Sequence, residues 1–336
     1  MAVRARALMT ALLLCLSAGL PAGSAGRQGG AAQQAGAGLV TDVLFTAVDK
    51  KGSAVTTLKK EDVRVLADGE PQEILRFERQ RDLPLLLAVL IDVSNSQERV
   101  LPAAKSAAVT FVSAAMTLGL DRAAVVTFTN DATLEQELTG DLSAVRAAIE
   151  RVQPSPPNVA YVSGAVIGKG GAPLPGSTAL WDAVWTVSEE VLTRGRGPGR
   201  RAVVLITDGI DTGSRVKLDE AVERAVQSDV VVYSVGMGDG DYGGVDKGDL
   251  RKLSERTGGR AFFPGKQKDL LPAFEQILQQ LQSQYVVSFA TRHRPDGSFH
   301  KLRLEVVNPE LRRQGVKLAH PEGFYAGNTS TAAPSR

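Results

Sequence analysis

The chain has 336 residues, of which 43% are hydrophobic and 23% charged, and it contains a single cysteine. This is the ordinary composition of a globular protein, and it excludes a collagen-like repeat, a disulfide scaffold and a chain that is disordered throughout. The 39 basic residues nearly balance the 37 acidic ones, and aromatic residues make up only 5%. The composition therefore gives no electrostatic reason to expect a nucleic-acid partner. The length corresponds to about two domains.

Residues 1–25 have the pattern of a secretory signal peptide. Arg4 and Arg6 precede an apolar run at 7–16, and small residues follow as far as Ala25. The run is shorter than the roughly 20 residues that cross a bilayer, so we expect a cleaved signal rather than a membrane anchor. The interpretation predicts a secreted or periplasmic protein with no membrane span in the mature chain.

The single cysteine, Cys15, lies inside this apolar run. Lipid attachment there is disfavoured, because Leu14 is larger than the residue that usually precedes a lipidated cysteine. Removal of the signal would leave a mature chain without cysteine and hence without disulfides.

Two segments are expected to be flexible, and a β segment follows the first of them. Residues 26–37, rich in Gly, Ala and Gln, resemble a linker, and 327–336 resemble a disordered tail. Residues 38–82 form the predicted N-terminal β segment, which contains the hairpin signal Asp68-Gly69.

Residues 83–284 alternate between continuous apolar runs and helical periods. The runs, typical of strands buried on both faces, are 85–91, 123–128, 202–206 and 230–235. Apolar stripes with helical spacing lie within 104–115, 218–225 and 270–281. Strands that alternate with amphipathic helices predict an α/β fold, with a doubly wound, mostly parallel sheet. Ligands bind such sheets at the carboxyl ends of the strands.

Residues 285–326 return to a β pattern and form the predicted C-terminal β segment. Neither β segment is long enough to bury a hydrophobic face alone. We therefore expect the two segments to pair in one small flanking β-module, with the α/β domain inserted between them. His293, His300 and His320 all fall in the C-terminal segment. They show no ligand-like spacing, so they are interpreted as surface or cross-strand residues rather than zinc ligands.

Three loops at predicted strand ends carry oxygen-bearing side chains. The first contains Asp92, Ser94 and Ser96, the second Thr178, and the third Asp208 within Thr-Asp-Gly. Carboxylate and hydroxyl oxygens are the ligands that hard cations such as Mg²⁺ select. The two serines could instead cap the following helix. Asp211, just beyond the third loop, is interpreted as a turn residue or an outer acid rather than a ligand.

These loops, in this order, resemble the metal-ion-dependent adhesion site (MIDAS) of a von Willebrand factor A (VWA) domain. The resemblance covers 83–284 and implies a Rossmann-like fold that holds Mg²⁺ or Mn²⁺. Ser94, Ser96 and Thr178 would ligate the cation directly, and Asp92 and Asp208 would act largely through water. The flanks, including Thr257–Pro264, are similar to a bacterial family of secreted VWA-related proteins. The stretch 154–175 is longer than the usual connection before the threonine loop.

The resemblance implies a protein-binding module for adhesion or scaffolding, not an enzyme. A partner protein would supply an acidic residue to the metal, and no catalytic residue or organic cofactor is expected. Two alternatives remain open. One is a metal-dependent hydrolase that uses the same carboxylates, although the loops contain no histidine to act as a base. The other is a structural module whose metal site is vestigial.

Overall fold

The computed structural model describes residues 39–80, 82–116, 119–155, 165–167, 177–193, 199–238, 244–291, 293 and 295–327. The predicted signal peptide with Cys15, the linker, nearly all of the predicted tail and most of the stretch 154–175 lie outside these residues. Within the described part, no helix has the length and apolar character needed to cross a membrane.

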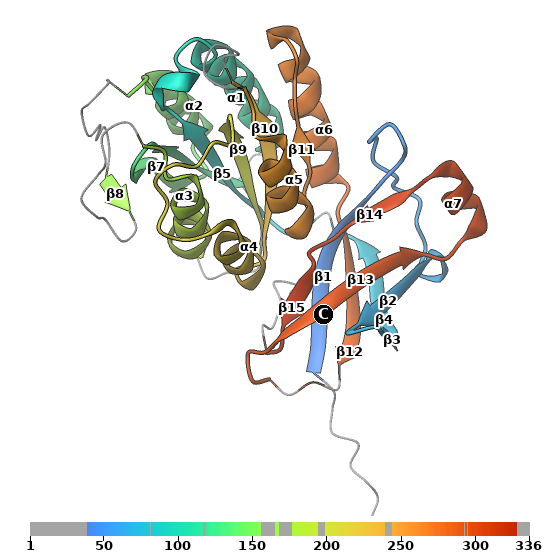
Figure 1. Ribbon diagram of the computed structural model, residues 1–336. Helices are drawn as coiled ribbons and strands as arrows, with labels where there is room; N and C mark the ends of the chain where they lie inside the picture. Colours follow the sequence, from blue (N-terminus) through green and yellow to red (C-terminus); the bar gives the residue numbers. More distant parts are fainter. Residues whose placement is uncertain are drawn as a thin grey trace, which may run out of the picture. The chain divides into compact units, whose positions relative to one another are not determined.

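The α/β domain is built on a seven-stranded sheet (Figure 1). The strands in spatial order are β11 (Ala261–Phe262), β10 (Val230–Gly236), β9 (Arg200–Thr207), β5 (Leu85–Asp92), β6 (Arg122–Phe128), β7 (Ala132–Thr139) and β8 (Ala165–Ile167). Pairing is parallel from β11 to β6 and antiparallel at β7 and β8. All eight residues of β5 are buried. The fold class predicted from the sequence is confirmed.

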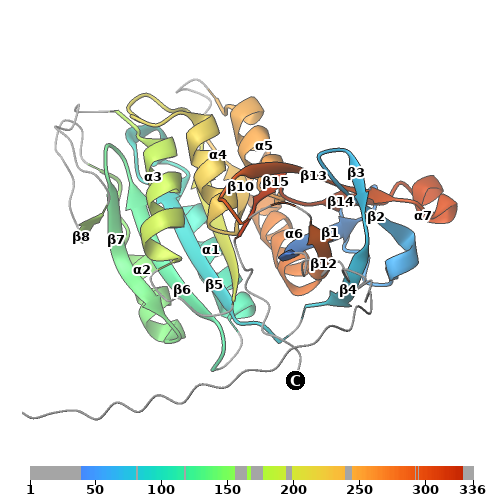
Figure 2. The ribbon, with the colours of Figure 1, turned by 90° about the horizontal axis from the view of Figure 1, so that it is seen from below.

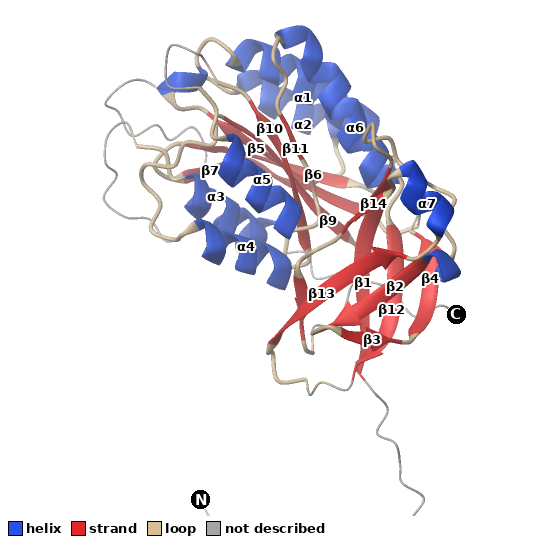
Figure 3. Cartoon of the chain, turned by 45° about the vertical axis from the view of Figure 1, so that its right-hand side comes forward, coloured by secondary structure: helices blue, strands red, loops and turns tan. Residues whose placement is uncertain are grey.

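Helices cover both faces of this sheet (Figure 3). One layer contains α1 (Leu101–Ala115), α2 (Leu142–Arg151) and α6 (Leu270–Gln282), and the other α3 (Leu180–Thr186), α4 (Leu218–Gln227) and α5 (Lys247–Arg256). Leu87 and Val89 of β5 face the first of these layers, and Leu86 and Leu90 face the second. The side alternates because successive side chains of a strand point to opposite faces. Short helical turns lie at Lys60–Asp62, Asn95–Gln97, Val187–Val191 and Gln267–Asp269.

The β-module combines strands from both ends of the described chain (Figure 2). One sheet has the order β14 (Lys317–Ala319), β1 (Leu39–Val48), β12 (Tyr285–Thr291), β4 (Ile74–Arg79); the other has β15 (Gly323–Tyr325), β13 (Phe299–Val306), β2 (Val63–Ala67), β3 (Glu70–Gln72). The short helix α7 (Pro309–Gln314) follows β13. Antiparallel pairing places Phe45 opposite Tyr285 and Val65 opposite Leu304. Side chains of both sheets share one hydrophobic core, so each segment buries its apolar face against the other.

The chain enters and leaves the α/β domain at neighbouring points. The N–H of Gln80 donates to the carbonyl of Gln284 at 2.8 Å. The buried Arg200 guanidinium donates to the carbonyls of Leu83, at 3.1 Å, and Leu281. Burial lowers the pKa of Arg200, and these carbonyls satisfy its donors in the absence of water. One buried arginine thus ties together the two chain segments that join the domain to the β-module.

Asp229 lies in the turn between α4 and β10 and carries an unfavourable charge. Its φ of +54° places it in the left-handed region, which Asp and Asn tolerate. Burial raises its pKa to about 6, and the carboxylate of Asp42 on β1 adds to the shift, while Arg201 opposes it. Asp42 and Asp229 line the same pocket beside Val230. The ionised form of Asp229 is therefore less stable in the folded protein than it would be in water.

Because of this raised pKa, we predict that Asp229→Asn increases the free energy of unfolding by an amount that depends on pH. An unfolded Asp titrates near about 3.9, so between about pH 4 and pH 6 the folded state binds more protons and its stability falls as the pH rises. Asn has no charge and accepts the same backbone conformation. In urea unfolding, we expect the variant to match wild type near pH 4 and to be more stable by on the order of 2 kcal/mol at pH 7. A stability difference that does not change with pH would contradict the assignment.

Candidate metal centre

The parallel register of β5 and β9 brings two of the predicted loops to one edge of the sheet. Ile91 pairs with Ile206, so the last residues of the two strands, Asp92 and Thr207, lie side by side. The loop that follows each strand therefore starts from the same edge. This is the edge at which open α/β sheets bind their ligands.

Two hydrogen bonds fix the Asp92 carboxylate, which is only 1% exposed. Its Oδ1 accepts the N–H of Ser94 at 2.9 Å, and its Oδ2 accepts the hydroxyl of Thr207 at 2.6 Å. The Thr207 hydroxyl also accepts the N–H of Gly209 at 3.0 Å. Thr207 thus positions both Asp92 and the third loop, a role that the sequence analysis missed. Its only sequence signal is its place before Asp208 at the end of a buried strand.

The two serines turn toward Asp208. The hydroxyl oxygens of Ser94 and Ser96 are 3.1 Å apart, and the Ser96 hydroxyl donates to Asp208 Oδ2 at 2.5 Å. Neither serine acts as the helix cap that was the simpler interpretation. Ser94 precedes the turn Asn95–Gln97 without a capping hydrogen bond from its side chain, and α1 starts only at Leu101.

Asp208 is held by the turn that follows it. Its side chain is buried, and Oδ1 accepts the N–H of Ile210 at 3.0 Å. Gly209 has a φ of +83°, and a Cβ there would lie 2.8 Å from Leu250. Only glycine fits this conformation and this space, so the Thr-Asp-Gly sequence reflects a steric need. Gln97, not singled out from the sequence, is buried and donates to the carbonyl of Met237 at 3.2 Å.

Thr178 reaches the same edge through its main chain. Its N–H donates to the Thr212 hydroxyl at 2.9 Å, and its carbonyl accepts the N–H groups of Thr212 at 2.9 Å and Gly213 at 3.0 Å. Its hydroxyl forms no hydrogen bond with the other four predicted ligands, all of which are described. Asp211 accepts the N–H of Leu180, the first residue of α3, at 2.9 Å. Hydrogen bonds therefore connect four of the predicted ligands, Asp92, Ser94, Ser96 and Asp208, to one another. Thr178 is connected only to the neighbouring loop, and Asp211 holds the first turn of α3.

The site concentrates negative charge in a buried place. Burial, reinforced by the neighbouring charge of Asp208, raises the pKa of Asp92 to about 6. No Lys or Arg side chain of the described residues forms an ion pair with either carboxylate. Two buried carboxylates without a cationic partner are costly, and a bound cation would offset that cost. With only oxygen donors around it, this arrangement fits a hard divalent cation.

Comparisons with known families agree with the fold. Two family models, both described as the von Willebrand factor type A domain, match residues 87–210 and 171–283. The first contains Asp92, Ser94, Ser96, Thr178 and Asp208, and the second contains Thr178 and Asp208. The chain therefore contains a von Willebrand factor type A domain. A comparison with curated proteins gives no match.

Several solved structures are similar to this chain. Proximal thread matrix protein 1 from the mussel byssus is 19% identical, with a TM-score of 0.49, and the match covers 64% of this chain and 51% of that one. A second structure of that protein is described as having a zinc-occupied MIDAS motif. A von Willebrand factor type A protein from Catenulispora acidiphila is 13% identical, with a TM-score of 0.47 and coverage of 89% and 77%. The match thus spans about half the length of the mussel protein.

The charge repulsion predicts that Asp92→Asn stabilises the metal-free protein. Asn can still accept the N–H of Ser94 and can donate to Thr207, while the buried charge disappears. In urea unfolding with EDTA at pH 7, we expect the free energy of unfolding to rise by on the order of 1–3 kcal/mol. Glu98→Gln, an exposed acid of the same loop, should change stability by less than about 0.5 kcal/mol. A loss of stability in Asp92→Asn would show that the buried charge is already compensated.

Proposed function

We propose that this protein is a divalent-metal-dependent protein-binding module for adhesion or scaffolding. The metal, Mg²⁺ or Mn²⁺, is held by Asp92, Ser94, Ser96, Thr178 and Asp208. One observation carries the proposal: two buried carboxylates meet two hydroxyls at the sheet edge, with no basic partner among the described residues. A cation is the group whose charge and ligand preference match this arrangement.

Each part of the site has a separate task. Asp92 and Asp208 supply the negative charge, and Ser94 and Ser96 supply neutral oxygen donors. Thr207 holds Asp92 in place, so that the carboxylate does not turn away. The bound cation would offer an open coordination position to an acidic side chain of a partner protein. Such a contact recognises a carboxylate by charge and requires no bond to break.

Binding is favoured over catalysis by the chemistry around the site. The donors at this edge are carboxylates and hydroxyls, and all three histidines of the chain, His293, His300 and His320, lie in the β-module. A hydrolase would need a general base within hydrogen-bond reach of its water. Asp92 and Asp208, the two buried acids of the proposed site, are already held by hydrogen bonds from Ser94, Thr207 and Ser96.

The proposal includes an extracytoplasmic location, secreted or periplasmic. It rests on the signal-peptide pattern of residues 1–25. A binding module of this kind would then meet its partner outside the cytoplasm or in the periplasm.

Metal binding should depend on the two serine hydroxyls. In calorimetric titrations of the metal-free protein with Mg²⁺ or Mn²⁺, we expect the double variant Ser94→Ala/Ser96→Ala to bind at least about tenfold more weakly than wild type, because it loses two donors. Glu98→Gln alters an exposed side chain of the same loop and removes no proposed ligand, so it should bind like wild type. Equal affinity of wild type and the serine variant would refute the site.

Partner binding should depend on the metal. We expect a protein captured from an envelope extract in Mg²⁺ to be released by EDTA and to be absent when the serine double variant is the bait. In the captured partner, replacing the contacting Glu or Asp by its amide should abolish binding, because the amide carries no charge for the cation. A partner retained equally in EDTA would favour a structural module with a vestigial site.

A further inference from the structure

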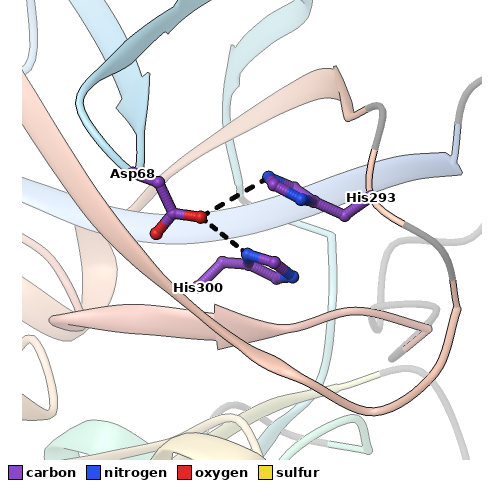
Figure 4. A group of neighbouring side chains, drawn as sticks. All are labelled: Asp68, His293 and His300. Carbon is purple, nitrogen blue, oxygen red and sulfur yellow. Dashed lines mark hydrogen bonds and ion pairs between the residues drawn. The ribbon is translucent and has the colours of Figure 1, made fainter.

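A second group of metal-ligating side chains lies in the β-module. Asp68, His293 and His300 point toward one another, and their candidate ligand atoms all lie within 4.8 Å of one another (Figure 4). Asp68 comes from the turn between β2 and β3, His293 from the segment after β12, and His300 from β13. The sequence analysis had interpreted these histidines as surface or cross-strand residues.

The carboxylate of Asp68 is oriented by the neighbouring strand. Its Oδ1 accepts the N–H of Lys301 at 2.8 Å, and the N–H of Asp68 donates to the carbonyl of Lys301 at 2.9 Å. Oδ2 is left to face both imidazoles, at 2.7 Å from Nδ1 of His300 and 3.7 Å from Nε2 of His293. The two rings stack with centroids 3.5 Å apart. One carboxylate oxygen thus lies close to a nitrogen of each ring.

A chain of hydrogen bonds orients the far side of His300. The Ser298 hydroxyl donates to Asp296 Oδ1 at 2.5 Å, and its oxygen is 2.9 Å from Nε2 of His300. Since the hydroxyl proton is already donated to Asp296, Ser298 accepts the N–H of Nε2. In a neutral imidazole, Nδ1 then carries a lone pair that faces Asp68 Oδ2. Two acceptors at 2.7 Å need either a proton or a cation between them.

An ion could reach this group. The side chains of Asp68, His293 and His300 are 43%, 31% and 13% exposed. The ring of Phe324 packs beside both imidazoles. Its centroid lies 6.3 Å from that of His293 and 5.5 Å from that of His300. Asp68 supplies the acidic oxygen of the group. The group therefore combines access, preorganisation and negative charge.

We propose that Asp68, His293 and His300 form a second metal site, which binds Zn²⁺ or a cation of similar softness. Two imidazole nitrogens and one carboxylate oxygen are typical ligands of zinc, whereas Mg²⁺ prefers oxygen alone. Zinc bonds of about 2.0–2.1 Å place tetrahedral ligands about 3.3 Å apart, which lies between the 2.7 Å and 3.7 Å that separate Asp68 Oδ2 from the two ring nitrogens. Ser298 acts as the outer partner that fixes the His300 tautomer. The fourth position is left to water or to an external ligand.

Zinc at this position would fasten together segments that are far apart in the sequence. Asp68 belongs to the hairpin from the N-terminal β segment, and both histidines belong to the C-terminal one. The ion would add a bridge between the two halves of the β-module. This site does not depend on the proposed function of the α/β domain, because it shares no residue with the oxygen site there.

The three histidines of the chain allow a direct test. The full-length protein is titrated with Zn²⁺ in excess Mg²⁺, and the histidine ring resonances are followed by NMR. We expect the resonances of His293 and His300 to shift and saturate at one equivalent, while those of His320 stay in place. His320 is a matched control, because its Nε2 accepts the N–H of Leu304 at 3.2 Å and it lies outside the group.

Variants separate the two sites and keep the test independent of folding defects. His293→Gln/His300→Gln should lower zinc affinity at least about tenfold, and His320→Gln and Ser94→Ala/Ser96→Ala should leave it unchanged. Asp68→Asn keeps an oxygen that can accept the N–H of Lys301, and Asn tolerates the φ of +50° at this position. This variant therefore replaces the double variant in the zinc titration if the double variant does not fold. Wild-type zinc affinity in Asp68→Asn or in the double variant, or zinc shifts at all three histidines alike, would overturn the proposal.

Discussion

The burial of two carboxylates at one edge of a parallel sheet is the constraint on which the site depends. Asp92 ends a strand whose eight residues are all buried, and the parallel register with β9 places Asp208 close to it. Both side chains are buried, and the N–H of Ser94 and the hydroxyls of Ser96 and Thr207 donate hydrogen bonds to their carboxylate oxygens. Hydrogen bonds from neutral groups do not cancel the charge, and the raised pKa of Asp92 reflects the remainder. This negative charge at the sheet edge is what a bound cation would neutralise.

The sequence predicts this part of the molecule well because burial leaves a clear pattern. The strands predicted at 85–91 and 202–206 are observed as β5 (Leu85–Asp92) and β9 (Arg200–Thr207), since strands buried on both faces have continuous apolar runs. The sequence does not predict the antiparallel strand β7, because its partly exposed residues mix charged and apolar side chains without a clear period. The role of Thr207 is not predictable from the sequence either. Threonine is common in strands, so its presence at a strand end gives no signal, and its hydrogen bond to Asp92 is a tertiary contact.

The histidine group shows a different limit of sequence reasoning. Spacing identifies ligands that lie on one local element, such as two histidines on one turn of helix. Here the ligands come from the β2–β3 turn and from two places about 230 residues later in the chain. They meet because β2 pairs with β13, with Ala67 opposite Leu302, so the turn at Asp68 reaches His300. Only the strand register, which the sequence did not specify, places them together.

In both candidate metal sites, a main-chain N–H orients a carboxylate by donating to one of its oxygens. In Asp208, Oδ1 accepts the N–H of Ile210 at 3.0 Å and Oδ2 faces Ser96 at 2.5 Å. In Asp68, Oδ1 accepts the N–H of Lys301 at 2.8 Å and Oδ2 faces His300 at 2.7 Å. In each case a main-chain amide fixes one oxygen, and the other points at further donors. What differs is the second donor type, hydroxyl oxygen in one site and imidazole nitrogen in the other. That difference favours a hard cation at the sheet edge and a borderline one in the β-module.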